Sequence, residues 1–132
     1  MSGELREQAK VVRWARQCAA RAGIEALRWL HHSPNGGVRA PRVGAQMAAL
    51  GVSPGFPDLI LPVRTLEHTG LAIEMKRPDG TGRLTPHQRG WLEHLEANGW
   101  RVRVCESADE ASEEIVSYLG LDPRDVPSIL DV

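Results

Sequence analysis

The chain has 132 residues, the usual length of one domain with its own hydrophobic core, which leaves no room for a second catalytic domain. Its N-terminal segment is charged from residue 4 onward, and no stretch approaches the roughly 18 consecutive apolar residues that cross a bilayer, so we expect neither a secretory leader nor a membrane span. Cys18 and Cys105 lack the spacing of a zinc knuckle or of a disulfide framework. We therefore expect a cytoplasmic protein with reduced cysteines and no membrane partner.

The net charge of −1 conceals an uneven distribution along the chain. Residues 1–105 contain 15 Arg or Lys and 9 Asp or Glu, whereas residues 106–132 contain one Arg and 8 acids. Fourteen of the 16 basic residues are Arg, whose planar guanidinium pairs with phosphate through two hydrogen bonds. This distribution favours a phosphate-bearing partner for the basic part, although a general preference of the genome for Arg would give the same composition.

The first third of the chain alternates helical and extended signals. Residues 3 to about 22 are predicted to form a helix that Gly23 ends, followed by a short extended piece from Ala26 to His31. Asn and Gly in residues 33–37 tolerate positive φ and predict a turn, and a second short helix is expected from about Arg39 to Leu50. The apolar stripe of the first helix consists of Leu5, Ala9, Val12 and Ala19.

The remaining elements follow from apolar runs and capping signals. Residues 58–63 (DLILPV) and 71–77 (LAIEMKR) read as two strands of one hairpin. Residues 85–98 form a predicted helix, with Thr85 as N-cap, Pro86 at the first helical position and Gln88 completing a capping box. A third strand is expected at 100–105.

The final part of the chain repeats the helix-start signature and then loses its periodicity. Residues 107–119 begin with Ser-Ala-Asp-Glu, a second capping-box pattern, and are predicted to be helical. Residues 120–132 contain two prolines and are expected to form an acidic tail without regular structure, beyond a domain at 1–119. The predicted fold class is α/β, with a central mixed sheet of about four strands flanked by helices.

The second strand of the hairpin carries a pair of opposite charges among apolar residues. Side chains alternate across a strand, so Glu74 and Lys76 project from one face while Ile73 and Met75 enter the other. An ionised pair in a sheet interior is costly unless it meets a partner, a metal or water. Taken alone, such a triplet is more often an ordinary ion pair. Its link to a Pro-Asp upstream and a glutamine helix downstream favours a functional site.

Two carboxylates are predicted to converge at this point. Asp58, at the start of the preceding strand, is near enough across a hairpin to share a site with Glu74, and a hard divalent cation relieves their repulsion. Mg²⁺, with Mn²⁺ as a substitute, would be bound by Asp58, Glu74 and the main-chain carbonyl of Met75. It would polarise a phosphodiester and activate a bound water, while Lys76 orients that water or stabilises developing charge.

These motifs resemble a known family. Gly55-Phe56-Pro57-Asp58-Leu59, Ile73-Glu74-Met75-Lys76 and Arg83-Leu84-Thr85-Pro86-His87-Gln88 are similar to the motifs of the virus-type replication-repair nuclease (VRR-NUC) domain, a branch of the PD-(D/E)xK superfamily. The resemblance covers about residues 4 to 119. It implies a restriction-endonuclease-like core, metal binding by Asp58 and Glu74, a catalytic role for Lys76, and a place in the site for Gln88.

A residue of the first helix is expected to complete the site. The resemblance implies a glutamate four residues before a glutamine, which fits Glu4 with Gln8, while Glu7 is the competing choice and a solvated helix face the alternative. Gln88 lies on the stripe of its helix that packs on the sheet, so it can serve both the capping box and the site. The candidate DNA contacts cluster around the motifs in sequence: Asn35, Gly36, Arg39, Arg42, Arg77, Arg83 and Arg89.

The resemblance also implies an activity and an assembly. Stand-alone family members of this size resemble enzymes that cleave Holliday junctions as homodimers, because two opposed sites nick two strands symmetrically. We expect a metal-dependent, structure-selective DNA endonuclease, a homodimeric Holliday junction resolvase of phage or prophage type acting in DNA repair. A monomeric flap or nicking nuclease and a module that binds branched DNA without cutting it are the alternatives.

Overall fold

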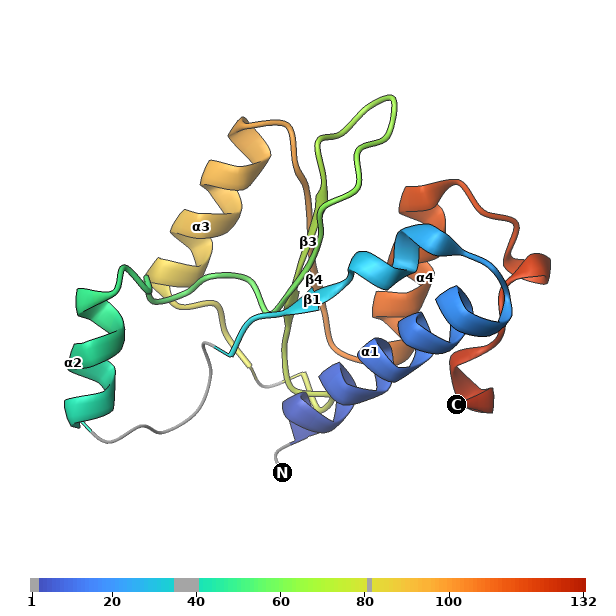
Figure 1. Ribbon diagram of the computed structural model, residues 1–132. Helices are drawn as coiled ribbons and strands as arrows, with labels where there is room; N and C mark the ends of the chain where they lie inside the picture. The colour runs from blue at the N-terminus through green and yellow to red at the C-terminus, as the bar shows by residue number, and fades with distance from the viewer. Residues whose placement is uncertain (1–2, 35–40, 81) are drawn as a thin grey trace.

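The computed structural model describes residues 3–34, 41–80 and 82–132 and contains one sheet between two helical layers (Figure 1). The helices are α1 (Gly3–Arg21), α2 (Pro41–Ala49), α3 (Pro86–Ala97) and α4 (Ala108–Leu119). The strands are β1 (His31–His32), β2 (Leu59–Leu61), β3 (Leu71–Met75) and β4 (Arg101–Cys105). In the described ranges, no helix is both long enough and apolar enough to cross a membrane.

The sheet has the order β1-β2-β3-β4 and is mixed, as predicted. β2 and β3 form the expected antiparallel hairpin, whereas β3 and β4 are parallel and are joined by a crossover through α3. β3 therefore has a hydrogen-bonded neighbour on both sides, and all five of its residues are buried. Charged side chains at the end of this strand lie in the most protected part of the fold.

The two faces of β3 meet different helices. Leu71, Ile73 and Met75 face the main core, which α1 and α4 close with Val11, Trp14, Cys18, Ala111 and Ile115. The alternate residue Glu74 faces α3, where it accepts a hydrogen bond from Gln88. Hydrophobic packing on one face thus fixes the strand that presents the polar residues on the other.

The helix predicted at 85–98 begins and ends where the sequence indicates. The Thr85 hydroxyl accepts from the Gln88 N–H at 3.1 Å, and the Gln88 side chain accepts from the Thr85 N–H at 2.9 Å, which completes the capping box. At the start of α4, Ser107 caps the Glu110 N–H, but the Glu110 carboxylate reaches back to the N–H of Glu106 instead of Ser107. The second capping box is therefore only half formed.

The extended piece predicted from Ala26 to His31 is wrong over most of its length. Glu25–Trp29 forms a 3₁₀ helix, η1, and only His31 and His32 are in a strand. Ala, Leu and Arg are good helix formers, and an ion pair of 3.5 Å between Arg28 and Glu25 supports the turn. Local propensity therefore outweighs the apolar run in this segment.

The buried face of α1 also differs from the predicted stripe. Gln8, Val11, Trp14, Ala15 and Cys18 are buried, whereas Leu5 is 38% exposed. Trp14 is the largest of these side chains. Because Trp14 packs in the core, the face of the helix that carries it is buried, and the predicted stripe lies to one side of that face. The helix therefore has a second apolar face that contacts the core only in part, through Val12.

The segment after α4 has more structure than predicted. Two short 3₁₀ helices, η2 (Pro123–Asp125) and η3 (Ile129–Asp131), follow it. The Trp14 indole N–H donates to the Pro127 carbonyl at 2.7 Å, and Val126, Ile129 and Val132 pack against the core. The prediction of an irregular tail is wrong because its apolar residues cover one side of α1.

α2 stands apart from the remaining elements in Figure 1 and has no buried residue. The predicted start of this helix at Arg39 lies outside the described residues, and the helix ends near the expected Leu50.

Candidate active site

Asp58 is held by contacts of both its main chain and its side chain. Its carbonyl accepts from the Ser33 N–H at 2.9 Å, which extends the pairing of β1 with β2. Its carboxylate atom Oδ2 accepts from the Met75 N–H at 2.8 Å. The side chain is therefore anchored to the end of β3, one residue from Glu74 and one residue from Lys76.

The residue before Asp58 explains why this carboxylate reaches the backbone of β3. Leu59 and Ile73 are the last paired residues at this end of the hairpin, and beyond them the Met75 N–H bonds to the Asp58 side chain instead of the Pro57 carbonyl. The Lys76 N–H points to β4, where it donates to the Cys105 carbonyl, so the N–H and carbonyl of Met75 point to β2. Proline has no N–H to donate to the Met75 carbonyl, which leaves this oxygen available as a ligand atom.

Glu74 is 2% exposed, and burial has a large effect on its chemistry. Burial first, and then the charge and hydrogen bond of Asp58, raise the pKa of the Glu74 carboxyl from 4.5 to about 9, while Lys76 acts in the opposite direction. Glu74 Oε1 accepts from Gln88, but no donor from residues 3–34, 41–80 or 82–132 reaches the buried Oε2 atom. Either a proton shared with Asp58 or a cation would stabilise this oxygen.

The Gln88 side chain connects Glu74 of β3 with Lys76, the residue that follows this strand. Its Nε2 donates to Glu74 Oε1 at 3.0 Å, and its Oε1 accepts from Lys76 Nζ at 2.8 Å and from the Thr85 N–H. Lys76 Nζ lies 3.9 Å from Glu74 Oε1, so the ion pair is long and the amide bridges it. Gln88 thus belongs both to the capping box and to the site.

Two glycines that sequence reasoning gave no role fit tightly around this network. Gly55 has φ +85°, and a Cβ at this position would lie 2.5 Å from the His87 carbonyl carbon and 2.6 Å from the Gln88 nitrogen. A Cβ on Gly82 would lie 3.2 Å from Lys76 Cδ. The signal that could have pointed to Gly55 is its position two residues before Pro57, where the loop must pass the start of α3.

The donor set is compatible with a hard divalent cation. Asp58 and Glu74 supply adjacent carboxylates, Glu74 Oε2 is buried without a donor among the described residues, and the Met75 carbonyl lies beyond the last paired residues of β2 and β3. No three His, Cys, Asp or Glu side chains in residues 3–34, 41–80 and 82–132 are grouped closely enough to hold a metal ion. A metal at this position would be held by two carboxylates, a carbonyl and water.

The first helix begins near the site, but its acids are not part of the carboxylate pair. A Cβ on Gly3 would lie 3.5 Å from Pro78, two residues beyond Lys76, so Glu4 follows directly after this contact. Glu7 pairs with Lys10 at 3.2 Å. Neither Glu4 nor Glu7 joins a group of three metal-binding side chains among the described residues, and the contribution of Glu4 stays a prediction.

Comparisons with known proteins agree with the motifs. Residues 4–109 match the VRR-NUC domain. The chain belongs to the VRR-NUC family. A solved structure described as a VRR_NUC domain protein is similar with a TM-score of 0.74 and 28% identity, covering 92% of this chain and 91% of that chain. No curated protein matches the sequence. The mixed sheet with flanking helices is the restriction-endonuclease-like core of this family, and membership supports a nuclease activity on DNA in general.

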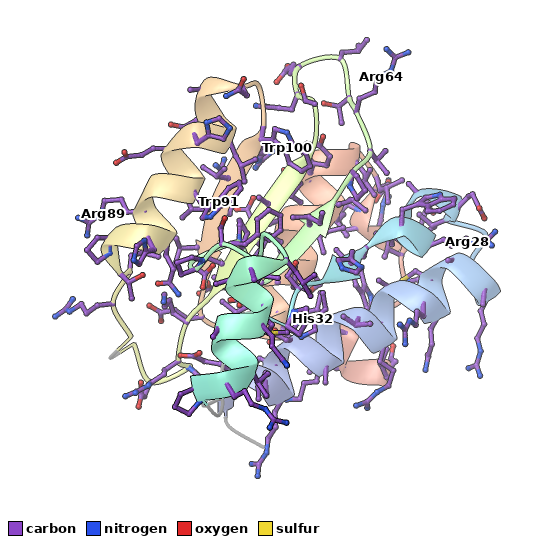
Figure 2. All side chains as sticks on the ribbon, turned by 60° about the vertical axis from the view of Figure 1, so that its left-hand side comes forward. Arg28, His32, Arg64, Arg89, Trp91 and Trp100 are labelled. Carbon is purple, nitrogen blue, oxygen red and sulfur yellow. The ribbon has the colours of Figure 1, made fainter. Side chains whose placement is uncertain are left out.

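Four of the seven residues predicted to contact DNA lie in the part of the chain that the structure describes. Arg42, Arg77, Arg83 and Arg89 are exposed, and Figure 2 shows Arg89 pointing away from α3, directly after Gln88. Asn35, Gly36 and Arg39 lie outside the described residues. The role of all seven in DNA binding stays a prediction.

Substituting Gly55 with Ala tests whether the close approach of the loop to α3 positions Gln88. The new Cβ would meet backbone atoms of His87 and Gln88, so the first turn of α3 must move away from Lys76. We expect a loss of about 1 to 3 kcal/mol in unfolding free energy and a fall of at least tenfold in nuclease turnover.

The matched control is Gly90→Ala in the same helix, where a Cβ would meet nothing within 4 Å. This variant should be neutral or more stable by up to about 1 kcal/mol, because Ala favours a helix over Gly. If the Gly55 variant keeps both wild-type stability and wild-type turnover, the loop does not position Gln88.

The pH dependence of stability tests the environment of Glu74. In EDTA the folded carboxyl keeps its proton up to about pH 9, whereas an unfolded glutamate loses it near pH 4.5, so this group stabilises fully below 4.5 and loses its contribution as pH rises to 9. The slope for one proton is about 1.4 kcal/mol per pH unit.

Glu74→Gln removes this titration while keeping the shape of the protonated side chain. Urea unfolding at pH 5.5, 7 and 8.5 should show the variant gaining stability over the wild type at each step. Parallel curves for the two proteins would contradict the raised pKa.

Proposed function

We propose that this VRR-NUC domain is a Mg²⁺-dependent DNA endonuclease that hydrolyses phosphodiester bonds, with Mn²⁺ as a substitute. The observation that carries the proposal is the buried Glu74 oxygen without a donor, next to the Asp58 carboxylate and an amine held by Gln88. A structural ion pair needs neither a second carboxylate nor an unsatisfied oxygen.

In this proposal the residues of the chain divide the work. Asp58, Glu74 and the Met75 carbonyl would hold the ion, with Glu4 as a further candidate ligand. A bound Mg²⁺ would polarise the scissile phosphate and lower the pKa of a coordinated water. The Lys76 amine, fixed 2.8 Å from Gln88 Oε1, stabilises the negative charge that develops on the phosphate or orients the attacking water.

We further propose that the enzyme acts on branched DNA as a homodimeric Holliday junction resolvase of phage or prophage type. One pair of carboxylates cuts one strand, so symmetric resolution requires two opposed sites, which a two-fold dimer supplies. The solved VRR_NUC domain protein supports the nuclease fold that such an enzyme needs.

The acidic end of the chain is expected to face away from the DNA. Residues 106–132 carry 8 acids and one Arg, and α4 packs on the core face of the sheet, opposite the face on which Gln88 meets Glu74. This arrangement keeps the acids of α4 away from the phosphates at the proposed site, whereas Glu106 directly follows Cys105, whose carbonyl accepts from the Lys76 N–H.

Lys76→Ala should abolish cleavage while leaving DNA binding within a few-fold of the wild type. Loss of one transition-state contact of this kind costs about 10² to 10³ in turnover, but the lysine is one positive charge among many for affinity. The measurement is cleavage of labelled four-way, flap, nicked and linear DNA in Mg²⁺, Mn²⁺ and EDTA, with anisotropy for binding.

The control is Lys10→Ala, which removes the other lysine of the chain and should cut normally. Cleavage in EDTA, or full turnover of the Lys76 variant, would refute the proposed chemistry. Binding of branched DNA by the wild type without cleavage under any metal would identify a non-cleaving module.

The dimer is tested by mixing subunits. Wild-type protein mixed with an excess of the Lys76 variant should convert a cruciform plasmid from linear to singly nicked product, because mixed dimers have one active site. Sedimentation at micromolar concentration should give twice the mass of the chain. A monomeric mass with preferred cleavage of flaps or nicks would replace the resolvase by a flap or nicking nuclease.

A further inference from the structure

A groove of about 750 Å³ lies along the outer side of α1, and Asp58, Glu74 and Lys76 do not line it. Its floor contains the second apolar face of α1, made by Leu5, Ala9, Val12 and Ala20. The edge strand β1 contributes His32, which Figure 2 shows beside α1. The core contacts Val12 on this face of the helix and leaves Leu5 and Ala20 exposed.

Two residues that line the groove each have a buried polar atom without a partner in the described part of the chain. Gln8 is 95% buried, and its Oε1 accepts no hydrogen bond. His32 Nδ1 is also buried and unpaired. Leaving a buried polar group unsatisfied costs about 1 to 3 kcal/mol, so these two side chains would gain by turning toward a ligand with hydrogen-bonding groups in the groove.

The charge of the groove selects the occupant. Arg13, Arg16 and Arg21 line it, and its lining contains no Asp or Glu. A second copy docked through the same face across a two-fold axis would bring arginines against arginines, which is unfavourable. A sugar-phosphate backbone matches the arginines with phosphates and the apolar floor with its sugars.

Both walls of the groove lead to the proposed active site. Leu5, at one end, follows Glu4, and Gly3 lies beside Pro78 just after Lys76. On the other wall, Ser33 follows His32 and donates its N–H to the Asp58 carbonyl. From Leu5 to Arg21 the helix rises about 24 Å, the length of about seven base pairs.

We propose that the α1 groove binds the sugar-phosphate backbone of a DNA arm that leaves the active site. This inference rests on the proposed function and extends it. It adds a phosphate-binding surface separate from the predicted DNA contacts Arg42, Arg77, Arg83 and Arg89. The groove fixes where the arm lies relative to the cut. This binding is electrostatic and does not depend on the base sequence.

The test is DNA binding by the double variant Arg13→Gln/Arg16→Gln, measured by anisotropy in EDTA over a range of salt concentrations. Two lost phosphate contacts should reduce the slope of log Kd against log salt by about 1.8 on duplex DNA or about 1.4 on single strands, which tells the two forms of arm apart. Affinity at 0.1 M salt should fall about tenfold or more.

The matched control is Arg28→Gln/Arg64→Gln, which removes two exposed arginines outside the groove, both labelled in Figure 2, and should change neither the slope nor the affinity. Gln17→Glu adds a negative charge to the groove lining without changing the side-chain size and should weaken binding too. Thermal melting confirms that each variant is folded.

An unchanged salt slope in both groove variants, with salt-dependent binding by the wild type, overturns the groove and leaves the proposed nuclease intact. A change in the sedimentation of DNA-free protein together with an unchanged slope also overturns it, because the groove would then be a protein interface. If the groove variants behave as expected and the wild type never cuts, only the proposed function fails.

Discussion

The side-chain amide of Gln88 is the contact on which the geometry of the site depends. It receives the Thr85 N–H and the Lys76 amine on one atom and donates to Glu74 from the other. A displacement of α3 would therefore disturb the helix cap and the charged pair together. The close approach of Gly55 to the first turn of α3 sets where this amide lies. Helix capping and chemistry share one residue, so neither can change alone.

The polar residues of the site lie where their burial costs the fold free energy of unfolding. β3 is buried along its whole length, and an amine and a carboxyl at its end lose hydration that apolar side chains would not miss. The raised pKa of Glu74 expresses this cost directly. The opposite face of the same strand, in the core with Trp14, supplies the hydrophobic packing that offsets it. Natural sites commonly give up local stability in this way.

The sequence predicted best where one residue type has one strong local preference. The capping box at Thr85 and the apolar runs of the hairpin located α3, β2 and β3 because these signals act over a few residues. The buried face of α1 was missed because several apolar stripes competed and a single tryptophan decided between them. The motif spacing located Asp58 and Glu74 together. The bond from the Met75 N–H to Asp58 depends on strand register to within one residue, which spacing alone does not supply.

Pro57 sets a limit on the hairpin that reaches beyond the site. The pairing of β2 with β3 ends at Leu59 and Ile73, and Pro57, which has no N–H, cannot donate a further hydrogen bond to this ladder. A sheet with a further hydrogen bond at this position would be more stable, but the Met75 carbonyl oxygen would then already accept a hydrogen bond. Proline thus leaves a backbone position at the end of the hairpin without a ladder hydrogen bond. The regular pairing of β2 with β3 therefore stops before Pro57.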